Sequence, residues 1–314
     1  MALKPAIVYD RTYQKIFVEI MPYFNVIIPT FNRKNKVRNA VNSVLAQSDK
    51  DFEIILVDDG SDDGTADLAD EFKNKITYIY QINSGVSSAR NRGIISSSAQ
   101  YITFLDSDDV WHKHKLNKHR EFIKSNPKNL IHQTEDIWIR NGARVNPKFK
   151  HIKPQGKIFI QSLDLCLISP SSVCISRSIF EKYGMFDEDL HACEDYDLWL
   201  RITPFENIGL VNEKLITRYA GHEDQLSSIY WGLDRFRLYS ILKLLHHYGD
   251  SLESMYIEAA INSAIQKSEI LLNGAIKREN KNLSNILSEI LTRLKDGSYI
   301  RLDYQSLLEK QDYL

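Results

Sequence analysis

Short apolar segments of strand length alternate with helix-like segments from Phe24 onward. The strand-like segments are rich in β-branched residues and comprise FNVIIP (24–29), EIILVDD (53–59), ITYIYQ (76–81) and YITFLD (101–106). The intervening stretches 33–47, 61–73 and 87–94 predict helices. Almost continuously apolar strands that alternate with helices predict a parallel sheet covered on both faces.

The pattern changes toward the C-terminus. A helix carrying Trp111, Leu116 and Phe122 is expected after the fourth strand, and residues 130–175 predict further strands and loops. From Trp231 onward the chain is expected to be wholly helical, with a stripe that favours a core or an oligomer seam: Leu238, Ile241, Leu242 and Leu245. We therefore predict an N-terminal extension at 1–22, an α/β domain at 23–229 and a C-terminal helical region at 230–314.

Composition narrows the class of protein. The 314 residues include 40 basic and 41 acidic side chains, a near-balance that argues against nucleic acid as the main partner. The odd number of cysteines, Cys166, Cys174 and Cys193, without C-x-x-C spacing, favours buried thiols in a reducing cytoplasm. No apolar run approaches the roughly 20 residues of a membrane-spanning helix, and the N-terminus lacks the apolar core of a signal peptide. A cytoplasmic location is therefore expected.

Polar residues follow each predicted strand at its carboxyl end. They are Pro29, Thr30 and Asn32 after the first strand, Asp58 and Asp59 after the second, Asn83 after the third, and Asp106, Ser107, Asp108 and Asp109 after the fourth. In open α/β sheets, ligands bind outside these ends. One aspartate after a strand is commonly a helix cap, so the convergence of the strands, rather than any single residue, predicts a ligand site.

The acidic run at 106–109 predicts a cation. In an extended segment, residues two apart point to the same side, so Asp106 and Asp108 can face one ligand. Two neighbouring carboxylates repel each other unless a cation lies between them, and Mg²⁺ or Mn²⁺ takes one or two carboxylates together with substrate phosphates. The alternative is a solvated acidic turn that caps the next helix.

The order of the motifs resembles family 2 glycosyltransferases of the GT-A fold. The matching segments are VIIPTFNR (26–33), EIILVDDGSDDGT (53–65), NSGVSSARNRGI (83–94), YITFLDSDDVW (101–111) and GMFDEDLHACEDYDLWLR (184–201). The resemblance covers roughly residues 24–225, about two-thirds of the chain. Relatives often have proline after the tryptophan, whereas this chain has the basic run His112–Lys115, which favours a solvated helix face over contact with an acidic acceptor or a membrane.

The resemblance implies a role for each matching residue. Pro29, Thr30 and Asn32, with Asp59 or Asp58 accepting a hydrogen bond from a uracil imide, would line the base and ribose pocket, and Asn83 and Arg90 would lie close to the nucleotide. Asp106 and Asp108, separated by Ser107, would hold Mn²⁺ or Mg²⁺ on the diphosphate. Asp195 matches the general base and Glu194 is its neighbour. His222 and Gln225 match a loop that closes over the donor, and His222 is a further candidate metal ligand.

The implied activity is metal-assisted transfer of a sugar, with inversion, from a nucleotide-diphosphate donor, a UDP-sugar above all. The enzyme would be of the hexosyl- or N-acetylhexosaminyl-transferase type, and its acceptor would be a glycan or a lipid-linked glycan. The stretch Tyr196–Ile202 predicts a helix, with Asp195 in or just before its first turn. The helix dipole there favours an ionised carboxylate, although simple N-capping is the alternative. A peripheral contact with the inner face of the membrane and a homo-oligomer through the C-terminal helices are further expectations.

Two other functions fit parts of the pattern. A non-catalytic module that binds a nucleotide sugar would share the motifs, but both carboxylate motifs are intact. A nucleotidyltransferase typically has a glycine-rich basic loop after the first strand, where this chain has PTFNRKNK without glycine. Redox chemistry on a dinucleotide is rejected because no G-x-G-x-x-G follows that strand.

Overall fold

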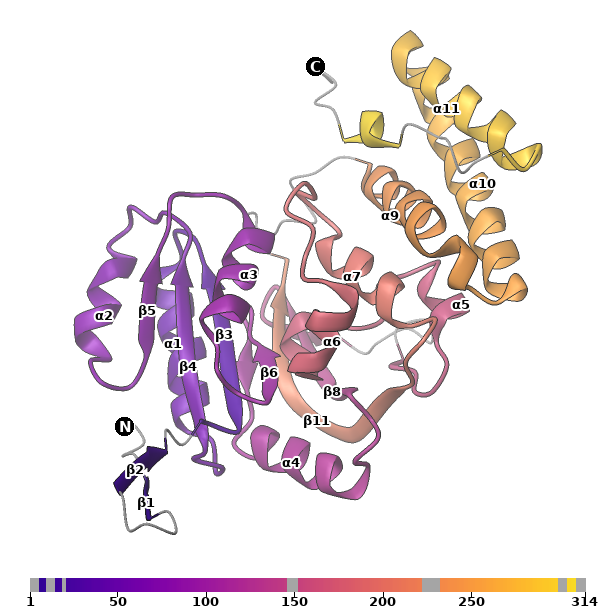
Figure 1. Ribbon diagram of the computed structural model, residues 1–314. Helices are drawn as coiled ribbons and strands as arrows, with labels where there is room; N and C mark the ends of the chain where they lie inside the picture. The colour runs from indigo at the N-terminus through magenta and orange to yellow at the C-terminus, as the bar shows by residue number, and fades with distance from the viewer. Residues whose placement is uncertain are drawn as a thin grey trace. The chain divides into compact units, whose positions relative to one another are not determined.

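The computed structural model describes residues 6–9, 15–18, 21–145, 152–221, 232–298 and 304–308 (Figure 1). The chain divides into two compact units. Unit 1 comprises residues 1–147, 170–184 and 209–219, and unit 2 comprises 148–169, 185–208 and 220–314. These units alternate along the chain, whereas the division predicted from the sequence is contiguous, and the boundary near residue 230 stays a prediction.

Unit 1 contains a nine-stranded sheet with the order β5-β4-β3-β6-β10-β8-β11-β7, and β9 pairs with β8. The strands are β3 (Phe24–Thr30), β4 (Phe52–Asp58), β5 (Thr77–Tyr80), β6 (Tyr101–Phe104), β7 (Val110–Trp111), β8 (Ile131–Arg140), β9 (Ala143–Val145), β10 (Val173–Ser176) and β11 (Ile208–Ala220). The pairs among β5, β4, β3 and β6 are parallel, as predicted. Antiparallel pairs, such as β10 with β6 and β11 with β7, make the whole sheet mixed. A separate antiparallel pair joins β1 (Ala6–Tyr9) and β2 (Lys15–Val18).

The central strand β3 is buried along its whole length, because helices cover both faces of the parallel strands. Val26 and Ile28 lie in one core cluster with Val37 and other residues of α1 (Lys34–Leu45). On the opposite face, Ile27 meets α3 (Val86–Ser96), and a Cβ at Gly93 would lie 2.4 Å from Cγ2 of Ile27. Alternate side chains of one strand therefore serve two apolar interfaces, and Gly93 allows the close approach of α3.

The strand order reverses between β3 and β6. From β3 the chain proceeds through β4 to β5 on one side and then returns to β6 on the other side. The region outside the carboxyl ends at such a reversal is the usual ligand site of open α/β sheets. Thr30 ends β3, and the acidic run begins two residues after β6.

Two predicted helices differ from the structure. The stretch predicted as a helix over 61–73 forms a short 3₁₀ turn (Thr65–Asp67) and a one-turn helix, α2 (Leu68–Glu71). Gly60 and Gly64 both have positive φ, which interrupts helical geometry before Thr65. Trp111 lies in β7 rather than in a helix, and α4 begins only at Lys115 (Lys115–Ser125).

Unit 2 is predominantly helical. Its described helices are α5 (Phe159–Ser162), α7 (Glu194–Ile202), α9 (Leu233–Tyr248), α10 (Ser254–Lys277) and α11 (Lys281–Lys295), whereas α6 (Arg177–Tyr183) belongs to unit 1. The predicted stripe of α9, including Leu238 and Leu242, lies in the apolar core of this unit together with Tyr196 and Leu200 of α7. Of the two roles expected for this stripe, the structure shows packing in an apolar core. None of the helices in the described ranges combines the length and apolarity needed to cross a bilayer.

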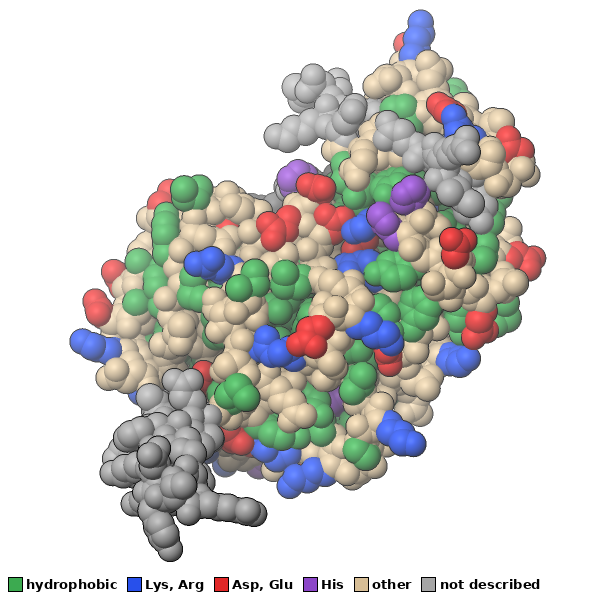
Figure 2. All heavy atoms as spheres, in the orientation of Figure 1, with side chains coloured by type: hydrophobic (Ala, Val, Ile, Leu, Met, Phe, Trp, Pro, Cys, Tyr) green, Lys and Arg blue, Asp and Glu red, His purple; other side chains and the backbone are tan. Residues whose placement is uncertain are grey.

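Charged side chains of both signs are interspersed on the face of the molecule shown in Figure 2. Lysine and arginine do not gather there into one continuous stripe among the described residues. This distribution accords with the near-equal numbers of basic and acidic residues.

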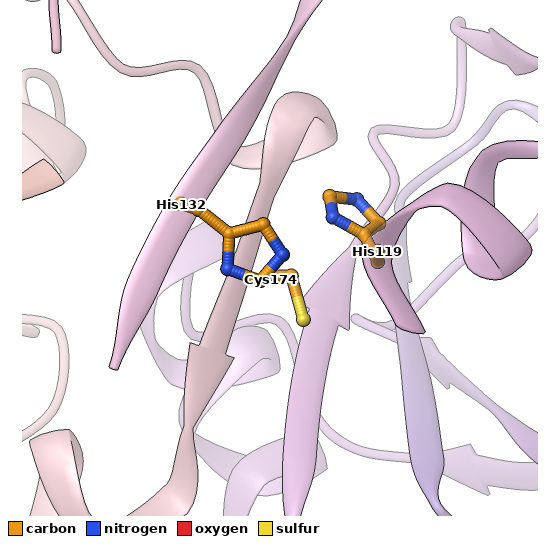
Figure 3. Close-up of side chains that lie close together, drawn as sticks. All are labelled: His119, His132 and Cys174. Carbon is orange, nitrogen blue, oxygen red and sulfur yellow. The ribbon is translucent and has the colours of Figure 1, made fainter. Parts of the chain in front are cut away.

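A buried polar cluster lies beneath α4 in unit 1. His119 of α4, His132 of β8 and Cys174 of β10 bring their potential ligand atoms within 4.8 Å of one another (Figure 3). Lys115, predicted on a solvated face, is instead fully buried; its Nζ donates to Nε2 of His119 and to the carbonyl oxygen of Ser172 at 3.3 Å. Nδ1 of His119 and both ring nitrogens of His132 are buried without a hydrogen-bond partner among the described residues. The buried ammonium of Lys115 beside these rings disfavours a metal cation at the same place, because like charges repel.

The cluster makes stability depend on pH. Burial lowers the pKa of His132 to about 3 and the pKa of His119 well below its ordinary value. His132 therefore stays neutral in the folded protein at pH 5, and folding also disfavours protonation of His119, whereas the unfolded chain protonates both rings below about pH 6.5. Since the unfolded state then binds more protons, the free energy of unfolding falls below that pH, by up to roughly 1.4 kcal/mol per pH unit for each histidine.

Replacing His132 by leucine should make this acid-side decline shallower, because one titrating ring is removed. Urea denaturation at pH 7, 6 and 5 measures the slope for the wild type and for His132→Leu. A variant whose stability declines as steeply as that of the wild type would contradict the proposed neutral, buried state of His132.

Candidate functional site

The loops after β3 and β4 are tied together by Asn32. Its backbone adopts φ 51°, a left-handed conformation that asparagine tolerates better than most residues. The Asn32 N–H donates to Oγ of Ser61 at 2.8 Å, and its Oδ1 accepts from the N–H of Asp62 at 2.8 Å. Pro29 and Thr30 precede this link at the end of β3. The predicted residues Pro29, Thr30 and Asn32 thus lie at the carboxyl edge, beside the loop that follows β4.

Asp58 and Asp59 use their carboxylates within the protein. Asp58 is fully buried and accepts hydrogen bonds from the N–H of Ser61 at 2.9 Å and from the hydroxyl of Tyr78 at 2.6 Å. Burial, followed by this hydrogen bond and the Asp58 charge, raises the pKa of Tyr78. Asp58 therefore links β4 to β5 and to the turn that follows β4.

Asp59 organises the loop that leads into α3. Its Oδ1 accepts from Nε2 of Gln81 at 2.7 Å and from the N–H of Ser84 at 2.9 Å, and its Oδ2 accepts from the N–H of Gly85 at 2.9 Å. This loop contains Asn83, whose side chain is exposed. A Cβ at Gly60, where φ is 87°, would lie 2.7 Å from the Asn83 nitrogen, so glycine permits the two loops to approach each other.

The acidic run forms a turn instead of the extended segment predicted from the sequence. The N–H of Asp109 donates to the carbonyl oxygen of Asp106 at 3.0 Å, which reverses the chain after β6. Arg90 of α3 donates from Nη2 to Oδ1 of Asp106 at 2.8 Å, and Arg33 donates from Nη1 to Oδ2 of Asp108 at 3.0 Å. Arg33 also lies 3.4 Å from Oγ of Ser107. The two predicted metal ligands therefore each face a guanidinium.

Asp109 and Ser171 support this turn from below. Oγ of Ser171 donates to Oδ2 of Asp109 at 2.7 Å and accepts from the N–H of Asp106 at 3.0 Å. The N–H of Tyr219 donates to Oδ1 of Asp109 at 3.2 Å. Burial and the charges of the neighbouring acids raise the pKa of Asp109 to about 8, against the opposing effect of Arg218. Sequence reasoning missed Ser171 because it lies 65 residues from Asp106 in a region without a recognisable motif.

The chemistry of the turn fits a hard divalent cation. Asp106 and Asp108 offer carboxylate oxygens, the ligands that Mg²⁺ and Mn²⁺ prefer. Their side chains keep 26% and 14% exposure, so both carboxylates are accessible, and both already attract cationic partners. His222, the third predicted metal ligand, and its neighbour Gln225 lie outside the described residues.

The predicted base lies in unit 2, in the first turn of α7. Oδ1 of Asp195 accepts from the N–H of Tyr196 at 2.7 Å, and Oδ2 accepts from Sγ of Cys166 at 3.3 Å. Burial and then the charge of Asp195 raise the pKa of Cys166 well above its ordinary value, so this thiol remains a donor. The sequence offered no signal for this contact. Because the acidic turn belongs to unit 1, a shared role of the two acid groups stays a prediction.

The neighbours of Asp195 are more deeply buried. Glu194 is 7% exposed and Asp197 is 1% exposed. Asp197 forms ion pairs with Arg201 at 2.8 Å and with Lys243 at 3.2 Å, which assigns it to the structure of unit 2. Asp195, in contrast to Asp197, accepts hydrogen bonds from one backbone N–H and one thiol.

Comparison with known proteins identifies relatives. Residues 25–184 match the model of the family described as Glycosyl transferase family 2. An uncharacterized glycosyltransferase of Rickettsia prowazekii is 34% identical over 206 residues, which is 62% of this chain and 63% of that protein. TuaG of Bacillus subtilis, a glycosyltransferase provisionally assigned to teichuronic acid biosynthesis, is 31% identical over 186 residues, covering 58% of this chain and 72% of TuaG.

The match spans only part of several relatives. A glycosyltransferase of Rickettsia felis is 33% identical over 199 residues, which is 61% of this chain but only 32% of that protein. Among solved structures, S. aureus TarS 1–349 in complex with UDP-GlcNAc superposes with a TM-score of 0.60 at 18% identity, covering 88% of this chain and 93% of TarS 1–349. At this identity the likeness shows a shared fold, and it confirms the fold class predicted from the sequence.

The hydrogen bond between Tyr78 and Asp58 should contribute measurably to stability. Tyr78→Phe removes one donor from a buried carboxylate, so we expect the free energy of unfolding to fall by about 1.5–3 kcal/mol. Tyr80→Phe is the matched control on the same strand, because Tyr80 is 58% exposed and should change stability by less than about 0.5 kcal/mol. Equal urea midpoints for the two variants would rule out a stabilising role of this hydrogen bond.

Proposed function

The chain belongs to glycosyl transferase family 2 and has a GT-A-like fold, and from this premise we propose that it is an inverting glycosyltransferase that uses a UDP-sugar. The observation that carries the proposal is the accessible acidic turn at the carboxyl edge of the parallel strands, beside the loops organised by Asn32 and Asp59. The UDP-GlcNAc complex of TarS supports the choice of donor. The provisional assignment of TuaG supports an acceptor among glycans of the cell envelope, free or lipid-linked.

The proposed donor site divides into a nucleoside end and a phosphate end. Thr30 ends β3, and Asp59 and Asn83 follow β4 and β5, so these three residues would line the pocket for the base and ribose. Arg90 would lie beside the phosphates, because its guanidinium already contacts Asp106 in the acidic turn. A divalent cation held by Asp106 and Asp108 would supply positive charge to the diphosphate as it leaves.

Asp195 is the proposed general base. Asp195 lies in the first turn of α7, and the donors from Tyr196 and Cys166 orient its carboxylate. It would take the proton of the acceptor hydroxyl while that hydroxyl attacks the anomeric carbon on the face opposite the diphosphate. One base acting without an enzyme nucleophile inverts the anomeric centre. A cytoplasmic location, contact with the inner face of the membrane and oligomerisation remain predictions.

Binding of the donor is tested first. A panel of nucleotide sugars screened by thermal shift with Mn²⁺ should identify a UDP-sugar that raises the melting temperature, since a bound ligand stabilises the folded state. Calorimetry with and without Mn²⁺ then measures donor affinity in two variants. In Asp108→Ala the affinity should no longer depend on Mn²⁺, because a proposed metal ligand is lost, whereas the control Asp70→Ala, in α2, should keep this dependence. Unchanged metal-coupled affinity in Asp108→Ala would remove the turn from the metal site.

Catalysis is tested separately from binding. Asp195→Asn should reduce turnover by roughly 10²- to 10⁴-fold, the usual contribution of a general base, while donor affinity survives. Asp189→Asn, an exposed acid in the preceding segment, serves as the control and should retain wild-type turnover. Wild-type turnover in Asp195→Asn would exclude Asp195 as the base.

Tight donor binding by the wild type without transfer or hydrolysis would favour the alternative function, a non-catalytic module that binds a nucleotide sugar.

A further inference from the structure

Two arginines compensate the charge of the acidic turn. Asp106 and Asp108 carry two negative charges, and Arg90 and Arg33 bring two positive charges to 2.8 Å and 3.0 Å from them. The arginines come from different elements, because Arg90 lies in α3 and Arg33 precedes α1. The adjacency of β3 and β6 places both arginines beside the same turn.

The two arginines differ in burial and in their position relative to a helix. The Arg90 side chain is 4% exposed, which fixes it against the turn. The Arg33 side chain is 17% exposed, and its residue stands at the N-cap of α1, outside the helix. A long side chain at such a position can turn to a new partner without disturbing the core. Arg33 is thus the more readily displaced counter-ion.

We propose that Arg33 is an exchangeable counter-ion that couples binding of the divalent cation to binding of the donor diphosphate. Without ligands, its guanidinium pairs with Asp108. A cation that binds Asp108 takes the oxygen that Arg33 contacts and repels the guanidinium, so the cation alone binds weakly. When a diphosphate is present, the displaced guanidinium gains a new anionic partner, and cation and donor bind cooperatively. This inference rests on the proposed donor site.

The proposal predicts effects of opposite sign for one substitution. Arg33→Gln removes the competing cation, so Mn²⁺ without nucleotide should bind about threefold to tenfold more tightly. UDP in the presence of saturating Mn²⁺ should bind about tenfold to a hundredfold more weakly, because a charge-assisted contact is lost. Free Mn²⁺ measured by electron paramagnetic resonance and UDP binding measured by calorimetry provide the two readouts, neither of which depends on turnover.

Matched variants separate charge from fold. Arg38→Gln removes an arginine of α1 that pairs with Glu71 at 2.8 Å, away from the acidic turn, and should leave both affinities unchanged. Arg33→Lys keeps the charge and should retain the weak binding of Mn²⁺ alone. Thermal melting of each variant establishes that it is folded before the titrations are compared.

The outcomes distinguish the inference from the function on which it rests. If the wild type binds neither UDP nor any UDP-sugar with Mn²⁺, the proposed donor fails. If the wild type binds UDP with Mn²⁺ and Arg33→Gln shows both affinities unchanged, or both weakened, only the counter-ion role is overturned. Tighter Mn²⁺ binding together with weaker UDP binding in Arg33→Gln alone supports it.

Discussion

Opposite charge at one turn is the constraint around which the candidate donor site is built. Asp106 and Asp108 belong to the same tight reversal after β6, where two uncompensated carboxylates would repel each other. Arg90 of α3 and Arg33, which precedes α1, offset that repulsion. Because the strand order makes β3 and β6 neighbours, residues far apart in sequence meet at the turn that we propose as the site of a cation and a diphosphate.

The acids at the strand ends divide into two groups by burial. Asp58, Asp59 and Asp109 are at most 4% exposed and accept hydrogen bonds from backbone N–H, hydroxyl or amide groups, so they hold loops in place. Asp106 and Asp108 keep more exposure and face arginines. The more deeply buried acids thus hold the loops, whereas Asp106 and Asp108 remain partly accessible beside arginines.

Unit 2 positions its candidate base by different means. The helix dipole and the N–H of Tyr196 act on one side of Asp195, and the Cys166 thiol acts on the other. The same helix anchors itself through Tyr196 and Leu200 in the apolar core with α9. These contacts restrict the orientation of the Asp195 carboxylate, which suits the general-base role that we propose for it.

Local pattern was enough to determine the parallel strands, α1, α3 and the start of α7, because periodicity and flanking polar residues are short-range signals. The polar residues at the strand ends could be selected for the same reason. Tertiary structure alone decided what each one does: Ser171 reaches the acidic turn from 65 residues away, and Cys166 reaches Asp195 from 29 residues away. The run of basic residues predicted a solvated Lys115, because such a run does not reveal that Lys115 packs against His119 within α4. Such contacts depend on strand order and packing, which no short stretch of sequence encodes.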